Sequence, residues 1–127
     1  MGMKIIYAGA PAFSVPPLQA VLDAGFEVAA VLTQPDKPVG RKAVLTPTSL
    51  KAFAAERGIP ALDFPKVREH VAELSAVGAD CMVTCAYGQI LTAEVLNAFP
   101  RGVYNIHASL LPRWRGASPI QHAILAG

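Results

Sequence analysis

The amino-acid sequence predicts an open α/β domain with a mostly parallel sheet and helices on both faces. Short runs of apolar and β-branched residues alternate with segments of helical composition, and this alternation is typical of βαβ units. With 127 residues, of which 53% are hydrophobic and 16% charged, the chain is long and apolar enough to bury a core. The sequence contains neither internal repeats nor low-complexity tracts. A single globular domain is therefore expected.

The first βαβ unit is expected near the start of the chain. Residues 3–8 form an apolar run typical of a buried strand, and a helix is expected at 14–24, with two prolines in its first turn. Gly25 ends that helix, and residues 26–33 form the second strand. Because a helix separates the two strands, they should lie parallel and be joined by a right-handed crossover.

The rest of the chain continues the alternation. Further strands are expected at 59–62, 81–86 and 103–107, and further helices at 46–57, 67–77, 93–97 and 119–126. Thr46 caps the first of these helices and Gly58 ends it. The run at 81–86 is apolar without a break, as a central parallel strand requires. Cys81 and Cys85 lie on one face of this strand, too far apart for a disulfide, and are expected to pack in the core.

Residues 34–46 interrupt this pattern with two prolines, a glycine and three basic side chains. Such a composition breaks regular structure and predicts an exposed, mobile, positively charged loop. Its cations are Lys37, Arg41 and Lys42. They either contact phosphate groups or are only solvated, because the net charge of +2 on the whole chain does not decide between the two.

Composition disfavours several classes of protein. The longest apolar runs are far shorter than the ~20 residues of a membrane-spanning helix. The first residues are more typical of a strand than of a secretory signal, so no membrane partner and a cytoplasmic location are expected. Neither the cysteine spacing nor a nearby pair of histidines suggests a metal site. The dinucleotide motif Gly-x-Gly-x-x-Gly is absent, which disfavours a nicotinamide or flavin cofactor.

The last expected strand carries the residues best suited to chemistry. A strand repeat of two residues puts Asn105 and His107 on one face, where the strand ends at the rim of the sheet. An amide donor and an imidazole at that point can stabilise a developing oxyanion. Alternatively, the two side chains only satisfy hydrogen bonds of their own loop. Residues 108–116 follow with two leucines, a tryptophan and two arginines, and a loop of that content favours a binding role.

The residues around this pair resemble a known family. The pair and the run that follows it, Ser109-Leu110-Leu111-Pro112, are similar to the signature of formyltransferases that use 10-formyltetrahydrofolate. Residues 113–121 resemble the methionyl-tRNA formyltransferases more closely than the glycinamide ribonucleotide or amino-sugar branches. Residues 9–13 and 33–38 favour the same branch. The resemblance spans essentially the whole chain.

The resemblance implies a Rossmann-like formyltransferase fold and an enzyme that transfers a formyl group. The donor would be 10-formyltetrahydrofolate, the acceptor the amino group of initiator methionyl-tRNA, and the full-length enzyme a monomer without a metal. Asn105 and His107 would be catalytic and would stabilise a tetrahedral intermediate. The folate site would comprise Ser109, Leu110, Leu111 and Pro112 together with Tyr87, Gly88, Gln89, Ile90 and Leu91. The tRNA acceptor stem would be contacted by Arg41 above all, and by Lys37 and Lys42.

The sequence departs from the family pattern in three ways. The family has a catalytic aspartate some way past the Ser-Leu-Leu-Pro segment and a C-terminal tRNA-binding domain, and the sequence reaches neither before Gly127. Ala12 stands where the family has an acidic residue. Residues 1–127 are therefore expected to form the N-terminal part of the catalytic domain and, alone, to formylate poorly or not at all.

Two other hypotheses stay open. One is a folate-dependent formyltransferase that acts on glycinamide ribonucleotide or an amino sugar. The other is a non-catalytic module that binds folate or RNA through the same surface.

Overall fold

A computed structural model describes residues 3–106 of the chain. Within them, five strands form one parallel sheet in the order β5-β2-β1-β6-β7. The strands of this sheet are β1 (Lys4–Gly9), β2 (Glu27–Leu32), β5 (Ala61–Leu62), β6 (Cys81–Cys85) and β7 (Val103–Asn105). The prediction of an open, mostly parallel sheet is confirmed. The helix expected at 119–126 lies outside the described residues.

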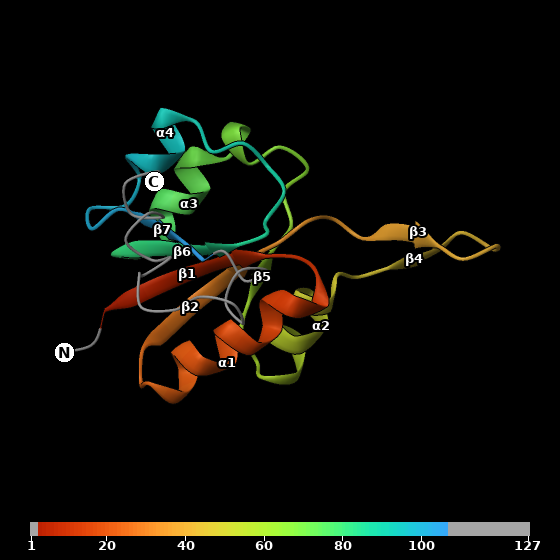
Figure 1. Cartoon of the computed structure of the whole chain (residues 1–127). Coiled ribbons are helices and arrows are strands. Elements are labelled where there is room, and N and C mark those ends of the chain that lie inside the picture. The colour runs from red at the N-terminus through yellow and green to blue at the C-terminus, as the bar shows by residue number, and fades with distance from the viewer. Residues whose placement is uncertain (1–2, 107–127) are drawn as a thin grey trace, which may run out of the picture.

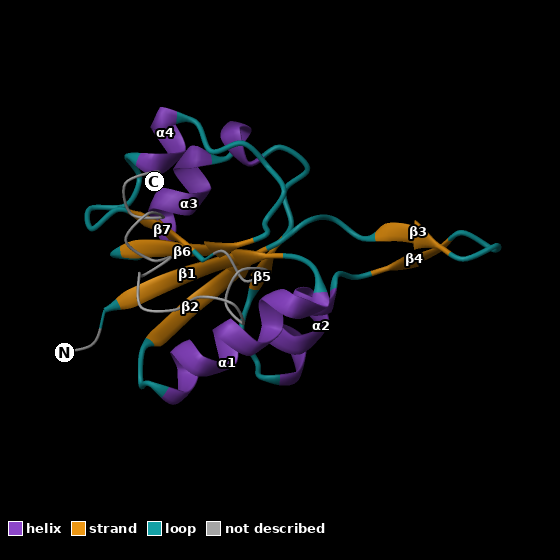
Figure 2. Cartoon of the chain, in the orientation of Figure 1, coloured by secondary structure: helices purple, strands orange, loops and turns teal. Residues whose placement is uncertain are grey.

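Helices cover both faces of this sheet (Figures 1 and 2). α1 (Val15–Asp23) and α2 (Ser49–Glu56) lie on one face, and α3 (Val71–Val77) and α4 (Ala93–Leu96) on the other. Two short 3-10 turns, at Ala12–Ser14 and Val67–Glu69, precede α1 and α3. The predicted layers of helix, sheet and helix are therefore present.

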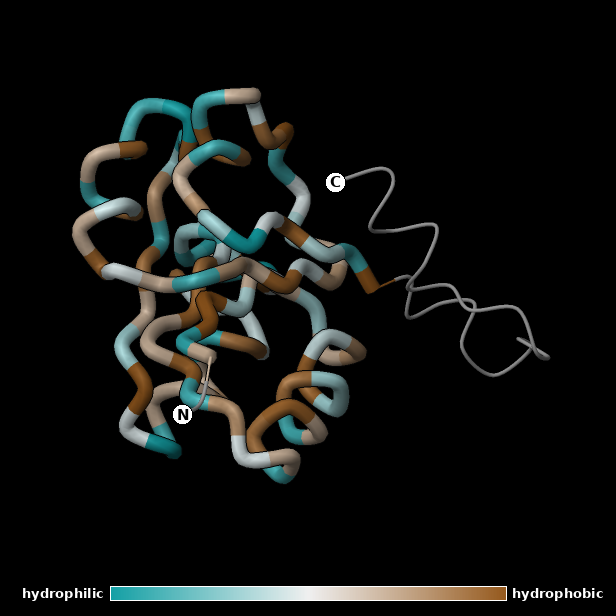
Figure 3. The backbone as a smooth tube through the Cα atoms, turned by 90° about the vertical axis from the view of Figure 1, so that its left-hand side faces the viewer, coloured by the Kyte–Doolittle hydropathy of each residue, from teal (hydrophilic) through white to brown (hydrophobic). Residues whose placement is uncertain are grey.

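Each face of the sheet has its own buried core, because successive side chains of a strand point to opposite faces. Tyr7 packs in the core with Leu18 of α1, whereas the neighbouring Ile6 packs in the other core with Leu74 of α3. All four side chains are fully buried. Many of the hydrophobic segments of the chain meet along the sheet, in the middle of the molecule (Figure 3).

The two cysteines of β6 confirm the expected packing role, because Cys81 and Cys85 are both buried in the core that α1 and α2 cover. Their surroundings are apolar enough that burial raises the pKa of the Cys81 thiol. Within residues 3–106, none of the helices has the length and apolar character that crossing a bilayer requires.

Two helix starts differ from the prediction. α2 is capped by Thr48, whose hydroxyl accepts a hydrogen bond from the Lys51 backbone amide (3.1 Å), and not by Thr46, which belongs to a strand. The helix expected at 67–77 is interrupted at His70, whose backbone is not helical (φ −128°, ψ 33°). The ring of His70 stacks on the ring of Phe64, and His70 is half-buried.

The largest difference concerns residues 34–46, which form an antiparallel hairpin and not an irregular loop. β3 (Lys37–Val39) pairs with β4 (Val44–Thr46), and the hairpin projects from the body of the molecule (Figure 1). Gly40 and Ala43 adopt the left-handed conformation in its turn, where the Ala43 amide donates to the Gly40 carbonyl (3.1 Å). Proline is tolerated here because both strands of an isolated ribbon are edges.

Candidate functional site

A cleft of about 510 Å³ lies at the carboxyl ends of β1, β2 and β6. Its walls come from the turn after β1 (Ala10 and Pro11), from Gln34 after β2, from residues 86–88 after β6, and from the root of the hairpin. Crevices at this edge of an open α/β sheet are where such folds bind their ligands. The position therefore marks the cleft as the candidate substrate site.

Asn105 ends β7, two strands away from β1, and is paired in register with Thr84 of β6. The Thr84 hydroxyl donates to the Asn105 side-chain oxygen (2.8 Å). This bond fixes the amide so that its nitrogen, a hydrogen-bond donor, is turned away from Thr84. Asn105 is half-buried and Thr84 is buried, so the amide is held at the sheet rim on a rigid support.

Sequence reasoning did not single out Thr84. Its signal was a lone hydroxyl in an otherwise apolar central strand, a position where a buried polar group needs a partner. The register of β6 against β7 was needed to show that this partner is Asn105.

His107 and the run Ser109-Leu110-Leu111-Pro112 lie outside the described residues. The alternation that predicts a shared face for Asn105 and His107 holds up to Ile106. Val103 packs in the core under α3 and α4, whereas Tyr104 and Ile106 pack in the opposite core. The meeting of the amide with the imidazole stays a prediction.

The turn at 87–91 presents its residues in different directions. Tyr87 is buried (4% exposed) and Leu91 packs against the same core, whereas Ile90 is 82% exposed. Burial raises the pKa of the Tyr87 hydroxyl, which has no hydrogen-bond partner within residues 3–106. Gly88 lines the cleft, so this turn borders the candidate site through its backbone.

The side chain of Gln89, which was expected to bind the cofactor, is hydrogen-bonded inside the protein. Its oxygen accepts from the Val67 amide (2.7 Å), and its nitrogen donates to the Gln34 side chain (3.0 Å) and to the Phe64 carbonyl (2.9 Å). A smaller pocket of about 250 Å³ lies next to Gln89 and Ile90.

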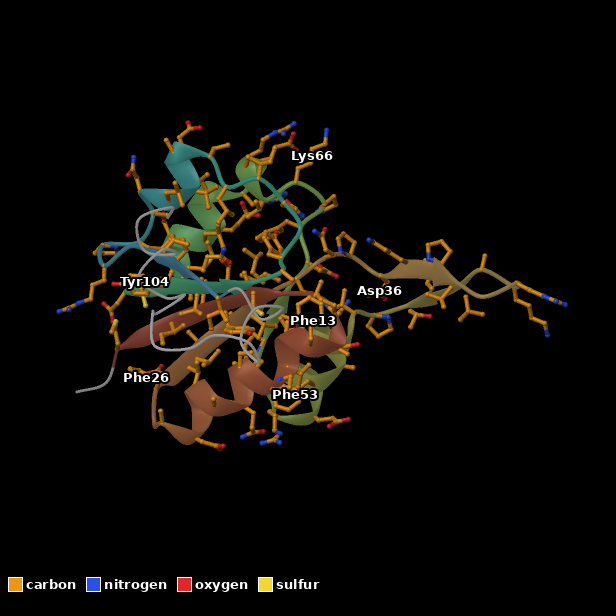
Figure 4. The ribbon with its side chains drawn as sticks, viewed as in Figure 1. Phe13, Phe26, Asp36, Phe53, Lys66 and Tyr104 are labelled. Atoms are coloured by element: carbon orange, nitrogen blue, oxygen red, sulfur yellow. The ribbon has the colours of Figure 1, made fainter. Side chains whose placement is uncertain are left out.

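The root of the hairpin is tied to the body beside the cleft. Lys51 of α2 lies 2.9 Å from both Asp36 and Asp63, and its hydrogen bonds, first to Asp36 and then to Asp63, raise the pKa of Lys51. The hydroxyls of Thr33 and Thr48 are 2.7 Å apart. Figure 4 shows Asp36 where the hairpin leaves the body.

The three basic residues of the hairpin are exposed, but they occupy two different places. Lys37 lies at the root and lines the cleft, whereas Arg41 and Lys42 lie in the turn between β3 and β4. The hairpin thus carries positive charge away from the cleft as well as into it. Within residues 3–106 there is no group of three or more side chains suited to hold a metal ion.

Comparison with known proteins gives a consistent result. A family model described as "Formyl transferase" matches residues 3–127. A methionyl-tRNA formyltransferase of Methylobacillus flagellatus is 53% identical over 127 residues, which cover 98% of this chain and 41% of that protein. The corresponding protein of Symbiobacterium thermophilum is 50% identical, with 98% and 39% covered. The chain thus spans about two fifths of the length of these relatives.

A solved structure with a similar fold is glycinamide ribonucleotide transformylase 1 from Symbiobacterium toebii. It superposes with a TM-score of 0.63 over 99% of this chain and 61% of its own length, at 23% sequence identity. At that identity the likeness concerns the fold.

Proposed function

Since the chain belongs to the formyl transferase family, we propose that it serves the transfer of a formyl group from 10-formyltetrahydrofolate to the amino group of initiator methionyl-tRNA. The observation that carries this proposal is the identity of 53% and 50%, over nearly the whole chain, with two methionyl-tRNA formyltransferases. Residues 1–127 would then supply the N-terminal part of the catalytic domain of a cytoplasmic, monomeric enzyme.

The chemistry calls for stabilisation of negative charge. When the amino group of methionine attacks the formyl carbon, the carbonyl oxygen becomes negative in a tetrahedral intermediate. A preorganised donor at that oxygen contributes about 3 kcal/mol to the transition state. The Asn105 amide, oriented by Thr84, is suited to this role because its donor end is fixed before the substrate arrives.

His107 is proposed as the second catalytic residue. As a donor it would hydrogen-bond to the oxyanion, and as a base it would move a proton from the attacking amine to the leaving nitrogen of the folate. After that transfer, the bond between the formyl carbon and the folate nitrogen breaks, and formylmethionyl-tRNA and tetrahydrofolate leave.

The two substrates would occupy different parts of the carboxyl edge. We propose that the turn at 87–91, together with Ser109-Leu110-Leu111-Pro112, receives the folate. The acceptor stem of the tRNA would meet the hairpin, where Arg41, Lys42 and Lys37 contact phosphates. Phosphate contacts of this kind supply affinity that depends on salt, and little sequence specificity.

A chimaera provides the test of this function. Residues 1–127 replace the matching segment of the Methylobacillus flagellatus relative, and formylation is measured with methionyl-tRNA and with glycinamide ribonucleotide as alternative acceptors. We expect turnover with methionyl-tRNA. In this chimaera Asn105→Ala should lower kcat by roughly 100-fold, because one oxyanion donor is lost, and should change either KM little.

Other outcomes would select the competing functions. Turnover of glycinamide ribonucleotide in place of methionyl-tRNA would assign the chain to that branch. An unchanged kcat in Asn105→Ala, with folate still bound, would favour a non-catalytic binding module. The 127-residue chain alone is expected to formylate poorly or not at all, which a single-turnover assay can check.

A further inference from the structure

We propose that Gln34 and Gln89 are a positioning pair that holds the turn at 87–91 in the shape that receives the formyl donor. This inference rests on the proposed function, because it concerns the turn assigned to the folate. Neither side chain needs to touch the donor. Their effect would pass through the backbone of the turn.

The first reason is the hydrogen bonding of Gln89. A glutamine side chain offers two N–H donors and one carbonyl oxygen. Both donors of Gln89 have partners, the Gln34 oxygen and the Phe64 carbonyl, and its oxygen accepts from the Val67 amide. The side chain therefore links the turn to the segment that leads from β5 to α3.

Gln34, which follows β2, makes the complementary link. Its oxygen accepts from Gln89, and its nitrogen donates to the backbone carbonyl of Tyr87 (2.7 Å). Gln34 lies two residues after the end of β2 and two residues before Asp36, which the Lys51 salt bridge ties to the body. One side chain thus connects the root of the hairpin with the turn.

The second reason is that, apart from the packing of Tyr87 and Leu91 in the core, the two glutamines supply the hydrogen bonds that hold the turn among the described residues. Within residues 3–106, the backbone of residues 87–91 makes no hydrogen bond to another backbone group. The Tyr87 carbonyl bonds to Gln34, and Gln89 anchors the middle of the turn. Hydrogen bonds from the two glutamine side chains consequently hold this turn, whereas backbone hydrogen bonds to β1 and β7 hold the preceding strand β6.

The third reason is the close approach at Gly88, which lies between Tyr87 and Gln89, the two residues of the turn that hydrogen-bond to Gln34. A Cβ atom on Gly88 would lie 2.9 Å from the Gln34 side-chain nitrogen, and the backbone there has φ of +92°. Only glycine adopts that conformation readily and leaves room for the amide. The turn is therefore folded closely around Gln34.

The test uses methionine, which has nearly the length of glutamine but does not replace its hydrogen bonds. Gln34→Met, Gln89→Met and the double variant are made both in the chain and in the chimaera, with Gln19→Met on the outer side of α1 as the matched control. Each variant should raise the KM for 10-formyltetrahydrofolate by roughly tenfold, since hydrogen bonds that preorganise the turn are lost. The kcat and the KM for methionyl-tRNA should change less than about twofold, and the double variant should be no worse than the worse single variant.

Nuclear magnetic resonance on the 127-residue chain tests the same pair without an activity assay, through amide exchange and backbone order parameters. Gln89→Met removes the acceptor of the Val67 amide, which should then exchange its hydrogen faster. Order parameters at residues 88–91 should fall from about 0.85 toward 0.6 in both single variants. Gln19→Met should leave these signals unchanged. If Gln89→Met does not fold, as judged by circular dichroism, Gln34→Met carries the test.

The outcomes separate the two proposals. Unchanged order parameters in both folded variants would overturn the positioning pair, and so would a more mobile turn with an unchanged KM for the donor. Failure of the unsubstituted chimaera to formylate would overturn the proposed function instead, while the order parameters and the exchange of Val67 still decide whether the pair holds the turn.

Discussion

Gly88 shows how much one missing side chain matters at the cleft. Its backbone is left-handed and Gln34 lies against it, whereas Gly25, after α1, has nearly the same φ (+90°) with nothing within 4 Å of a Cβ atom. The two positions therefore form a matched pair. A side chain at position 88 would meet both backbone strain and crowding, whereas a side chain at position 25 would meet backbone strain only.

Gly88→Ala should lower the free energy of unfolding by about 2–3 kcal/mol, and Gly25→Ala by about 1 kcal/mol, because a Cβ atom at position 88 would also push the Gln34 side chain out of its hydrogen bonds to Tyr87 and Gln89. Urea denaturation of the 127-residue chain measures both values. Equal losses for the two variants would mean that Gln34 moves aside freely, against the close packing described here.

At the end of β7, the shared face of two candidate residues was predictable from the sequence but the support of Asn105 was not. The spacing of Asn105 and His107 indicated a shared face, since strand alternation is a local property. The hydrogen bond from Thr84 depends on the register between β6, which ends at Cys85, and β7, which begins only at Val103. A single sequence does not encode that register in any local pattern.

Among the elements, the hairpin carries the exposed cations Lys37, Arg41 and Lys42, for which we propose contacts with tRNA phosphates. The triple variant Lys37→Gln, Arg41→Gln and Lys42→Gln should bind tRNA more weakly without a change in the KM for the folate. If each cation neutralises one phosphate, the slope of log affinity against log salt should become less steep by about 2–3 units. Filter binding of the chimaera at several salt concentrations measures that slope, and an unchanged slope would mean that these side chains are only solvated.

The elements that sequence reasoning located correctly are those with a strong local signal. β1, β2 and β6 are continuous apolar runs, and α1 begins with prolines at its first positions, as predicted. The hairpin differs from the prediction because prolines and a glycine in a short segment usually break regular structure. Val39 and Val44, on either side of the turn, were the pattern that favoured a hairpin.

For the whole molecule, the two cores share one sheet, and we expect them to unfold as one cooperative unit. Leu18→Ala and Leu74→Ala each remove a fully buried side chain, one from each core, and each should cost about 3 kcal/mol of unfolding free energy. Val39→Ala, on the exposed hairpin, is the control and should cost less than about 0.5 kcal/mol. Urea denaturation should remain a single transition in all three variants. A second transition in one of them would show that the two faces unfold separately.

The hairpin also bears on how molecules of this protein behave at high concentration. A two-stranded ribbon that stands away from the body has open edges and, here, exposed Val39, Val44 and Leu45, features that favour pairing with a neighbouring molecule and aggregation. Pro38 lacks the amide hydrogen that such pairing needs. The positive charges of two hairpins would also repel each other when the hairpins approach. Pro38 and the basic residues, which made the segment resemble a loop in the sequence, thus disfavour aggregation through the hairpin.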